Sequence, residues 1–437
     1  MAEQMKPSGI DWIGDIPKSW KVKPIAYMTK SRSGGTPDRN NLLYWENGTI
    51  PWMSSGEVNK VNIYDTDEKI TTLAVHHSSA KIISKNAVMV ALNGQGKTKG
   101  MSAILRIDSA CNQSLCAFSC NAGILYYEYL FWCFQTMYTY LRQMSGDDVR
   151  DGLAASYVKK QKIPVPKYEE QQAIADFLDK ECAQIDSIAA DLEKQIELLQ
   201  QYKKSLITEA VTKGLDKSVP MKDSGVEWLG KIPEHWDVEP IKYRVTFHNG
   251  DRGENYPSKS ELQSEGISFI NAGHLEGDGL NMDNMDYISE EKYRIMGGVK
   301  LRSGDILYCL RGSVGKNAIV DMNQGTVASS LVAIRSVRIS AEYLYYCLNS
   351  HIEEVQRYLL DNGTAQPNLS ADNLGKYKIC IPPVEEQMTI VEYLNNICSQ
   401  VDNLIIGKRK QLSTIQQHKK SLIYEYVTGK KRVKEVR

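Results

Sequence analysis

The sequence predicts a mixed α/β (α+β) chain built as an internal repeat, in which each of two globular parts is followed by one long helix. Three observations predict this fold class. The segment 169–213 contains no Pro or Gly, and its apolar residues recur at steps of three and four, as in a coiled-coil helix. The segment 9–20 (GIDWIGDIPKSW) recurs as 225–236 (GVEWLGKIPEHW). Short segments rich in β-forming residues alternate with apolar-faced helical segments in both globular parts.

The repeat has an offset of 216 residues, which also relates EEQ at 169–171 to EEQ at 385–387 and KKSLI at 203–207 to 419–423. Such a repeat usually marks one structural unit. Similarity is weak from 25 to 157 and from 242 to 374. We therefore divide the chain into a first globular domain at 1–163, a spacer helix at 164–215, a second globular domain at 216–380, and a second helix with a basic tail at 381–437.

Within the globular domains, residues 86–92, 305–310 and 329–334 are predicted to be short buried strands. Residues 126–142 and 341–360 are predicted to be helices with apolar faces. Loops rich in Gly, Ser, Asn and Thr separate them. A glycine followed by lysine comes soon after a buried strand in both domains, at Gly96-Lys97 and at Gly315-Lys316. We expect these two turns to correspond.

Two long helices with matching apolar seams are most simply buried against each other. We expect them to be antiparallel, because that orientation leaves the two globular parts at opposite ends. Gly407 and Lys408 interrupt the second seam, so a local weakness is expected there. The predicted seam residues are Ile174, Leu178, Ile185, Ile188, Leu192, Leu199, Leu206, Ile390, Leu394, Val401, Leu404, Leu412, Ile415 and Leu422.

Composition places the chain among globular proteins of two or three domains. Its nine cysteines show no CxxC pair, so free thiols in a reducing cytosol are expected. No signal segment and no run of about 18 apolar residues is present, which predicts a cytoplasmic protein that does not span a membrane.

Net charge is zero for the whole chain but not for its parts. Residues 1–168 carry 20 basic and 14 acidic groups, whereas residues 214–384 carry 18 and 23. The helix 169–213 carries 5 basic and 10 acidic groups. The first globular domain therefore suits phosphate binding better than the second. The acidic helix suits contact with protein better than contact with DNA.

Motifs for catalysis are weak. Gly96-Lys97-Thr98 ends like a phosphate-binding P-loop, but Ala91 stands where the first glycine should be. Asp38 with Asp67-Glu68-Lys69 loosely fits a magnesium nuclease arrangement, which is absent from the second repeat. No methyltransferase motif and no Ser/His/Asp or HExxH arrangement stands out. No catalytic site is predicted.

The paired G-[IV]-[DE]-W-[IL]-G-x-I-P-x-x-W openings, the EEQ helix entries and KKSLITEAVTKG at the end of the first helix resemble the specificity subunit of Type I restriction–modification systems. The resemblance covers both repeats. It implies two target-recognition domains that each read one half of an asymmetric double-stranded DNA site. It also implies an antiparallel helix pair that sets the gap between half-sites and docks methyltransferase subunits.

The resemblance further implies that the chain itself binds no cofactor. S-adenosylmethionine, ATP and Mg²⁺ would be bound by partner subunits, two for modification and two for restriction. Two alternatives stay open at this point: a stand-alone nuclease or NTPase, and an architectural coiled-coil protein.

Candidate DNA contacts follow from loop position and chemistry, since Asn and Gln pair best with adenine and Arg and Lys with guanine. These candidates are Arg32, Ser54, Asn93, Gln95, Lys97 and Lys99 in the first domain, and Arg252, Asn271, His274, Arg311, Lys316 and Gln366 in the second.

Overall fold

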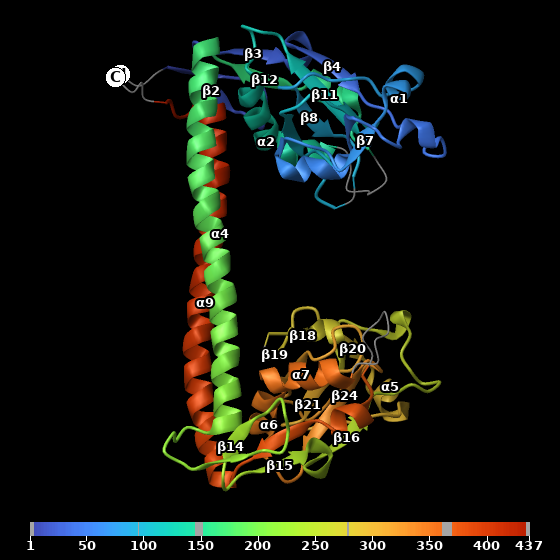
Figure 1. Ribbon diagram of the computed structural model, residues 1–437, viewed down its shortest axis with the longest axis vertical. Coiled ribbons are helices and arrows are strands. Elements are labelled where there is room, and N and C mark those ends of the chain that lie inside the picture. Colours follow the sequence, from blue (N-terminus) through green and yellow to red (C-terminus); the bar gives the residue numbers. More distant parts are fainter. Residues whose placement is uncertain (1–3, 95, 145–151, 278, 361–368, 434–437) are drawn as a thin grey trace. The chain divides into compact units, whose positions relative to one another are not determined.

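The computed structural model describes residues 4–94, 96–144, 152–277, 279–360 and 369–433. The chain divides into two compact units: Met1–Leu192 with Lys410–Arg437 is unit 1, and Glu193–Arg409 is unit 2. Each unit holds one globular part and a portion of each long helix (Figure 1). The predicted mixed helix and strand fold is confirmed.

The globular part of unit 1 consists of many short strands and three helices. Its strands are β1 (Met5–Pro7), β2 (Asp15–Pro17), β3 (Lys21–Pro24), β4 (Thr29–Ser33), β5 (Ile50–Met53), β6 (Asn62–Ile63), β7 (Glu68–Ile70), β8 (Val88–Ala91), β9 (Ser102–Leu105), β10 (Ala110–Cys111), β11 (Leu115–Cys120) and β12 (Lys162–Val165). Its helices are α1 (Thr72–His77), α2 (Tyr127–Met144) and α3 (Ala155–Lys160), with 3-10 turns η1 (Ile25–Tyr27), η2 (Leu42–Tyr44) and η3 (Ser55–Lys60).

These strands form a five-stranded sheet of order β4-β11-β8-β9-β6 and a three-stranded sheet of order β10-β5-β7, in which β10 and β5 are parallel. All four residues of β8 are buried, as the run of apolar residues predicts for a strand covered on both faces. The strands β3 and β12 pair antiparallel, so the segment between them starts and ends at one place.

The globular part of unit 2 has a similar set of elements. Its strands are β13 (Met221–Asp223), β14 (Lys231–Pro233), β15 (Asp237–Pro240), β16 (Val245–Asn249), β17 (Ile267–Ile270), β18 (Leu275–Glu276), β19 (Gly279–Leu280), β20 (Asp286–Ile288), β21 (Ile306–Cys309), β22 (Asn317–Ile319), β23 (Thr326–Val327), β24 (Leu331–Ser336) and β25 (Lys378–Ile381). Its helices are α5 (Glu290–Ile295), α6 (Ala341–Leu348), α7 (His351–Leu360) and α8 (Ala371–Gly375), with 3-10 turns η4 (Ile241–Tyr243), η5 (Lys259–Glu261) and η6 (Ala272–His274).

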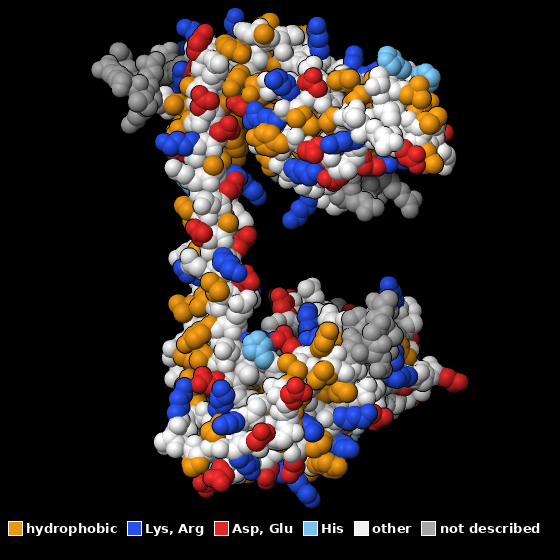
Figure 2. Space-filling view, in the orientation of Figure 1, with side chains coloured by type: hydrophobic (Ala, Val, Ile, Leu, Met, Phe, Trp, Pro, Cys, Tyr) orange, Lys and Arg blue, Asp and Glu red, His pale blue; other side chains and the backbone are white. Residues whose placement is uncertain are grey.

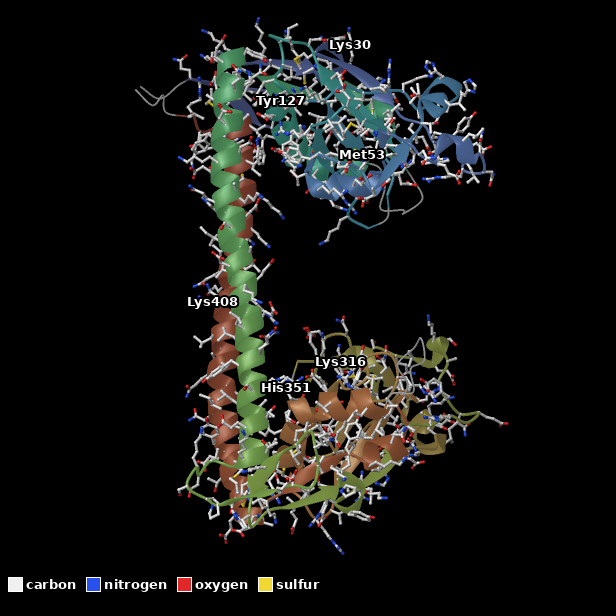
Figure 3. The ribbon with its side chains drawn as sticks, viewed as in Figure 1. Lys30, Met53, Tyr127, Lys316, His351 and Lys408 are labelled. Atoms are coloured by element: carbon white, nitrogen blue, oxygen red, sulfur yellow. The ribbon has the colours of Figure 1, made fainter. Side chains whose placement is uncertain are left out.

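The sheet orders of unit 2, β16-β24-β21-β22 and β20-β17-β23, repeat those of unit 1 except at one edge, where the described strands of unit 2 include no counterpart of β6. The fold is therefore repeated even where the sequence is not. The single helix predicted for 341–360 is wrong, because Asn349 and Ser350 separate α6 from α7. The Asn349 side chain pairs with Asn317, and the backbone N–H of His351 donates to Thr208 Oγ1 on the neighbouring long helix at 2.9 Å. His351 is labelled in Figure 3.

The two long helices are α4 (Tyr168–Lys213) and α9 (Val384–Val427). The bounds of α4 lie within one residue of the predicted 169–213, and α9 lies inside the predicted region 381–437. In unit 1, Lys419 Nζ lies 2.6 Å from Asp186 Oδ1. In unit 2, Lys203 Nζ lies 2.8 Å from Asp402 Oδ2. The residue numbers of the two ion pairs differ by 216, and α9 numbers fall as α4 numbers rise, so the pairing is antiparallel.

Most of the predicted seam residues are buried or half-buried, but those at one repeated position are exposed. Ile188 and Leu404, which are 216 residues apart, are 48% and 56% exposed. Ile405, the residue after Leu404, is buried instead. A step of three or four cannot distinguish these adjacent positions, because both lie near the same helix face. α9 continues without a break through Gly407. The buried predicted residues are Ile174, Leu178, Ile185, Leu192, Ile390, Leu394, Val401 and Leu422, and the half-buried ones are Leu199, Leu206, Leu412 and Ile415.

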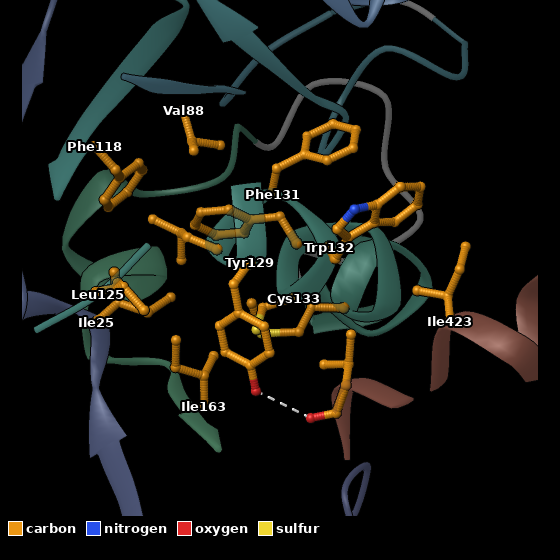
Figure 4. Close-up of a cluster of buried hydrophobic side chains, with 14 of the residues drawn as sticks. Ile25, Val88, Phe118, Leu125, Tyr129, Phe131, Trp132, Cys133, Ile163 and Ile423 are labelled. Atoms are coloured by element: carbon orange, nitrogen blue, oxygen red, sulfur yellow. Dashed lines mark hydrogen bonds between the residues drawn. The ribbon is translucent and has the colours of Figure 1, made fainter. Parts of the chain in front are cut away.

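Each globular part is tied to the helices by a buried tyrosine. In unit 1, the single hydroxyl proton of Tyr129 has two acceptors within reach, since Oη lies 3.1 Å from Val427 O and 3.0 Å from Pro164 O, within the cluster drawn in Figure 4. In unit 2, Tyr343 Oη donates to Val211 O at 3.2 Å. The hydroxyl needs a partner when buried, and a helix end supplies carbonyls that have no partner within the helix.

The repeated EEQ sequence now has a physical reason. Glu170 accepts a hydrogen bond from Trp20 Nε1 at 3.2 Å, and Glu386 accepts one from Trp236 Nε1 at 2.8 Å. The following glutamine, Gln171, is fully buried; its Oε1 accepts from Tyr126 N, and its Nε2 donates to the carbonyls of residues 124 and 166. The motif therefore locks the start of each long helix onto its own globular part.

Candidate nucleic-acid interface

Two β-hairpin loops, one in each unit, are the principal candidate site. In unit 1 the loop lies between β8 and β9: Ala91 N donates to Met101 O at 2.9 Å, and Gly100 N donates to Ala91 O at 2.8 Å. In unit 2 it lies between β21 and β22, where Cys309 N donates to Lys316 O at 2.8 Å and Gly315 N donates to Cys309 O at 3.2 Å. The two loops therefore close with the same frame of backbone hydrogen bonds.

This frame corrects the expected pairing of the glycine turns. Gly315 corresponds to Gly100, and both have left-handed backbones with φ of 94° and 84°. Lys316 therefore corresponds to Met101 and not to Lys97. Between the closing bonds the first loop spans 92–100, nine residues, and the second spans 310–315, six residues. Lys97 lies in a loop that is three residues longer than its counterpart.

The predicted side chains of the first loop differ in exposure. Asn93 and Lys97 are exposed, whereas Lys99 is only 9% exposed and Gln95 lies outside the described residues. Arg32 is exposed on β4, with Nη1 3.5 Å from Ile82 O. Ser54 is half-buried in a capping box with Glu57 at the start of η3, so it serves at least to hold that turn.

In unit 2, Asn271 and His274 are engaged with each other. His274 is buried, its Nδ1 accepts from Asn271 N at 3.1 Å, and Asn271 Nδ2 donates to Asp286 Oδ2 at 3.0 Å. These side chains hold η6 in place. Polar residues in a loop can thus satisfy the loop itself, which the sequence alone does not reveal.

Three further unit 2 candidates, Arg252, Arg311 and Lys316, are basic and exposed. Arg252 Nη2 lies 3.4 Å from Ser329 O, and Lys316 Nζ lies 3.5 Å from Leu275 O beside the β18–β19 hairpin (Figure 3). Arg311 is exposed in the β21–β22 loop. Gln366 lies outside the described residues. Arg311 and Lys316 therefore lie on one hairpin.

The structure offers no support for the two weak catalytic motifs. Gly96-Lys97-Thr98 leads into strand β9 and not into a helix, so it lacks the helix N-terminus that a P-loop uses to bind phosphate. Glu68 of the nuclease-like motif is held by Arg39, whose two terminal nitrogens bond its two carboxylate oxygens. The Arg39 hydrogen bond lowers the pKa of Glu68.

A second candidate surface lies on the helix pair within unit 2. A groove of about 390 Å³ is lined by Gln195, Leu198, Leu199, Tyr202, Leu404 and Lys408. Leu198, Tyr202 and Leu404 are each about half exposed. Hydrophobic side chains gather along the helices on the face shown in Figure 2. Exposed apolar side chains in a contiguous groove are typical of a protein-docking surface.

Sequence reasoning missed the groups that support the hairpins. Tyr138 and Arg142 of α2 bond the backbone of the unit 1 loop, and Glu353 and Arg357 of α7 lie against Gly315 in unit 2. Their positions on helices distant in sequence gave no local signal.

In the part of the chain that is described, no helix has the length and hydropathy needed to cross a membrane.

The fold defines the class of protein first: the chain has two α/β units of closely similar sheet order, and each unit packs on antiparallel segments of two long helices. Residues 17–198 and 236–414 both match the family described as the Type I restriction modification DNA specificity domain. The chain belongs to this family of Type I restriction–modification specificity subunits and carries the target-recognition domain twice.

Known relatives agree with this assignment. The chain is similar to the MjaVIII Type I specificity subunit of Methanocaldococcus jannaschii, with 26% identity over 434 residues, 96% of this chain and 95% of that one. It is 31% identical over 192 residues to the EcoR124I/EcoR124II specificity subunit of Escherichia coli, 42% of this chain and 45% of that one. A solved chain from a study of complex assembly and conformational transition in the type I R-M system has the same fold, with a TM-score of 0.68 at 18% identity, covering 94% and 98% of the two chains.

Proposed function

We propose that the domain at 1–163 reads one half of a bipartite, asymmetric double-stranded DNA site and that the domain at 216–380 reads the other half. The observation that carries this proposal is the pair of hairpin loops, which share one backbone frame but differ in length and in exposed side chains. Two such loops suit two half-sites of different sequence, because side chains on base edges carry sequence information and the scaffold does not.

Six exposed candidates are the side chains that we propose to approach DNA: Arg32, Asn93, Lys97, Arg252, Arg311 and Lys316. The exposed Lys and Arg side chains suit guanine edges or phosphates, and Asn93 suits an adenine edge. Gln95 and Gln366 stay predictions. Ser54, Lys99, Asn271 and His274 are proposed only as supports of the reading loops, because the last three are buried or bonded within their own turns.

The chain is proposed to be non-catalytic and cytoplasmic. S-adenosylmethionine, ATP and Mg²⁺ would be bound by two methyltransferase and two restriction subunits. The weakness of the nuclease-like motif supports this division of labour, since the carboxylate of Glu68 is already taken by Arg39.

The helix regions 164–215 and 381–437 are proposed to set the gap between half-sites. Seven residues inserted both after Gln195 in α4 and after Arg409 in α9 would preserve the antiparallel register of the ion pairs. One heptad adds about 10 Å of helix, or about three base-pair steps. We expect a longer gap with unchanged half-sites, whereas seven residues inserted after the exposed Lys217 should leave the gap unchanged.

The groove of unit 2 is proposed to dock a methyltransferase subunit. Leu198→Lys should weaken assembly with that subunit, measured by size-exclusion chromatography, and leave the melting temperature nearly unchanged because the side chain is half exposed. Gln200→Lys adds the same charge on the same helix outside the groove and should assemble normally. Equal assembly of both variants would remove the groove from the proposal.

The main test is a map of methylated bases in the DNA of cells with and without this gene. Loss of one bipartite methylated motif is the expected result. An unchanged map, with the methyltransferase subunit present, would contradict the proposed function.

A further inference from the structure

We propose that Tyr138 and Arg142 are positioning residues that fix the β8–β9 loop in the conformation that presents Lys97 to DNA. This inference rests on the proposed function of the first domain. The two side chains lie on α2, 41 to 46 residues away in sequence from the loop atoms that they bond. We call the pair the loop clamp.

The loop clamp bonds three carbonyls of a single loop. Tyr138 Oη donates to Lys97 O at 2.7 Å. Arg142 Nη1 donates to Gly96 O at 2.8 Å and approaches Lys99 O at 3.3 Å. The same nitrogen lies 3.3 Å from Tyr138 Oη, and the guanidinium carbon lies 5.6 Å from the centre of the Tyr138 ring. The two side chains therefore support each other as well as the loop.

These contacts determine what the loop presents on its other side. In a trans peptide the N–H points opposite to the C=O of the same peptide unit. Because the carbonyls of Gly96 and Lys97 point to α2, the N–H groups of Lys97 and Thr98 point away from it. The Lys97 side chain is exposed. The loop thus presents hydrogen-bond donors, which suit the O6 and N7 acceptors of guanine or a phosphate oxygen.

The loop clamp acts on a loop that is longer than its counterpart in unit 2. The closing frame of hydrogen bonds is common to both hairpins, but the unit 1 loop has three additional residues between its closing bonds. Gly96 is left-handed, with φ of 59°, and a short segment of this kind has many alternative conformations when nothing holds it. Gly100 also lies against the loop clamp, since a Cβ there would be 3.5 Å from Arg142 Cγ.

The experiment uses the full chain assembled with its methyltransferase subunits. Arg142→Met removes the donors and keeps the aliphatic stem, and Arg142→Lys keeps the charge. Lys85→Ala is the matched control, because it removes one exposed charge from the same unit away from the loop. The readouts are the methylated motif, selected from DNA with both half-sites randomised, and amide hydrogen exchange of peptides covering the loop.

We expect Arg142→Met to speed exchange in the loop at least tenfold and to relax the base preference at one or two positions of one half-site only. Arg142→Lys should recover part of that preference, and Lys85→Ala should change neither readout. If the loop clamp acts through Lys97, the double variant Arg142→Met/Lys97→Met should have the same motif as Lys97→Met alone.

Three results would overturn the loop clamp. The first is an unchanged methylated motif for Arg142→Met although hydrogen exchange in the loop is faster, and the second is an equal loss of base preference at both half-sites. The third is a fall of about one in the slope of log affinity against log salt for Arg142→Met, which would make Arg142 itself a phosphate contact. Absence of any bipartite motif for the wild-type complex would instead overturn the proposed function, and the role of the loop clamp in DNA reading with it.

Discussion

The two units agree where they meet the long helices and differ where their hairpins end. At the helices, a tryptophan, a tyrosine and a glutamine make corresponding hydrogen bonds in both units. At the hairpins, the loops differ by three residues and are backed by different side chains. The difference teaches that residues bonded to the long helices must keep the same identity in both units, because they make the same contacts. Residues at the loop tips make no such contacts and can differ. The following predictions test or refine this comparison.

The helix entries should show the largest effects. Gln171→Leu leaves three backbone groups without the partners that the buried glutamine supplies, and each such loss costs about 1–3 kcal/mol when the group is shielded from water. Gln387→Leu removes two such bonds. We expect a loss of about 3 kcal/mol or more for the first and about 2 kcal/mol for the second, measured by urea unfolding with hydrogen exchange in each unit. A large effect in only one unit would break the comparison.

Both closing glycines should be intolerant of a side chain. Gly100→Ala and Gly315→Ala both place a Cβ in the left-handed region, which costs about 1–2 kcal/mol. Gly315→Ala should cost more, because its Cβ would lie 3.1 Å from Arg357 Nε, against 3.5 Å from Arg142 Cγ at Gly100. Thermal unfolding is the measurement. Gly56→Ala is the control, since its Cβ would meet only Ser54 Oγ, at 4.0 Å.

Acid should weaken unit 1 through Glu128. Burial alone would raise the pKa of this carboxyl, but hydrogen bonds from Tyr126, Arg106 and Tyr127 together lower it. A lowered folded pKa gives stability that is present above the ordinary value of about 4.3 and is lost as the pH falls through the folded pKa. Glu128→Gln should flatten the pH dependence of unit 1 below about pH 4.3, measured by hydrogen exchange of α2 peptides. If stability depends on pH in the same way in Glu128→Gln as in the wild type, Glu128 is not the source of that dependence.

The two ion pairs between the long helices should contribute least to the free energy of unfolding, and their contributions should be equal. Lys203→Ala and Lys419→Ala each remove one lysine–aspartate pair near the surface, which costs about 0.2–1 kcal/mol and less at high salt. Chemical unfolding at low and high salt measures this. Clearly different losses for the two variants would show that the helix pair is not symmetric in energy.

The long helices could be predicted from the sequence almost to the residue, because Pro and Gly mark their ends and the apolar steps mark their length. The exposed positions of Ile188 and Leu404 could not, because neighbouring apolar residues fit the same steps. The repeated sheet order was also hidden, since strand pairing depends on partners distant in sequence. The sequence indicated the loop that carries Lys97, but Tyr138 and Arg142, which hold it, lie on a helix whose pattern shows only its buried face.

The pairing of β3 with β12 has a consequence for how such a protein can change. The chain leaves the scaffold after Pro24 and returns at Lys162, which are partners across one two-stranded ladder, and Pro240 and Lys378 are partners in the same way in unit 2. Neighbouring strands are only about 5 Å apart. A gene segment for 25–161 or 241–377 could therefore be exchanged by recombination for one of any length that has the same two ends, without altering either helix. Inheritance of a new DNA preference would need only two crossovers.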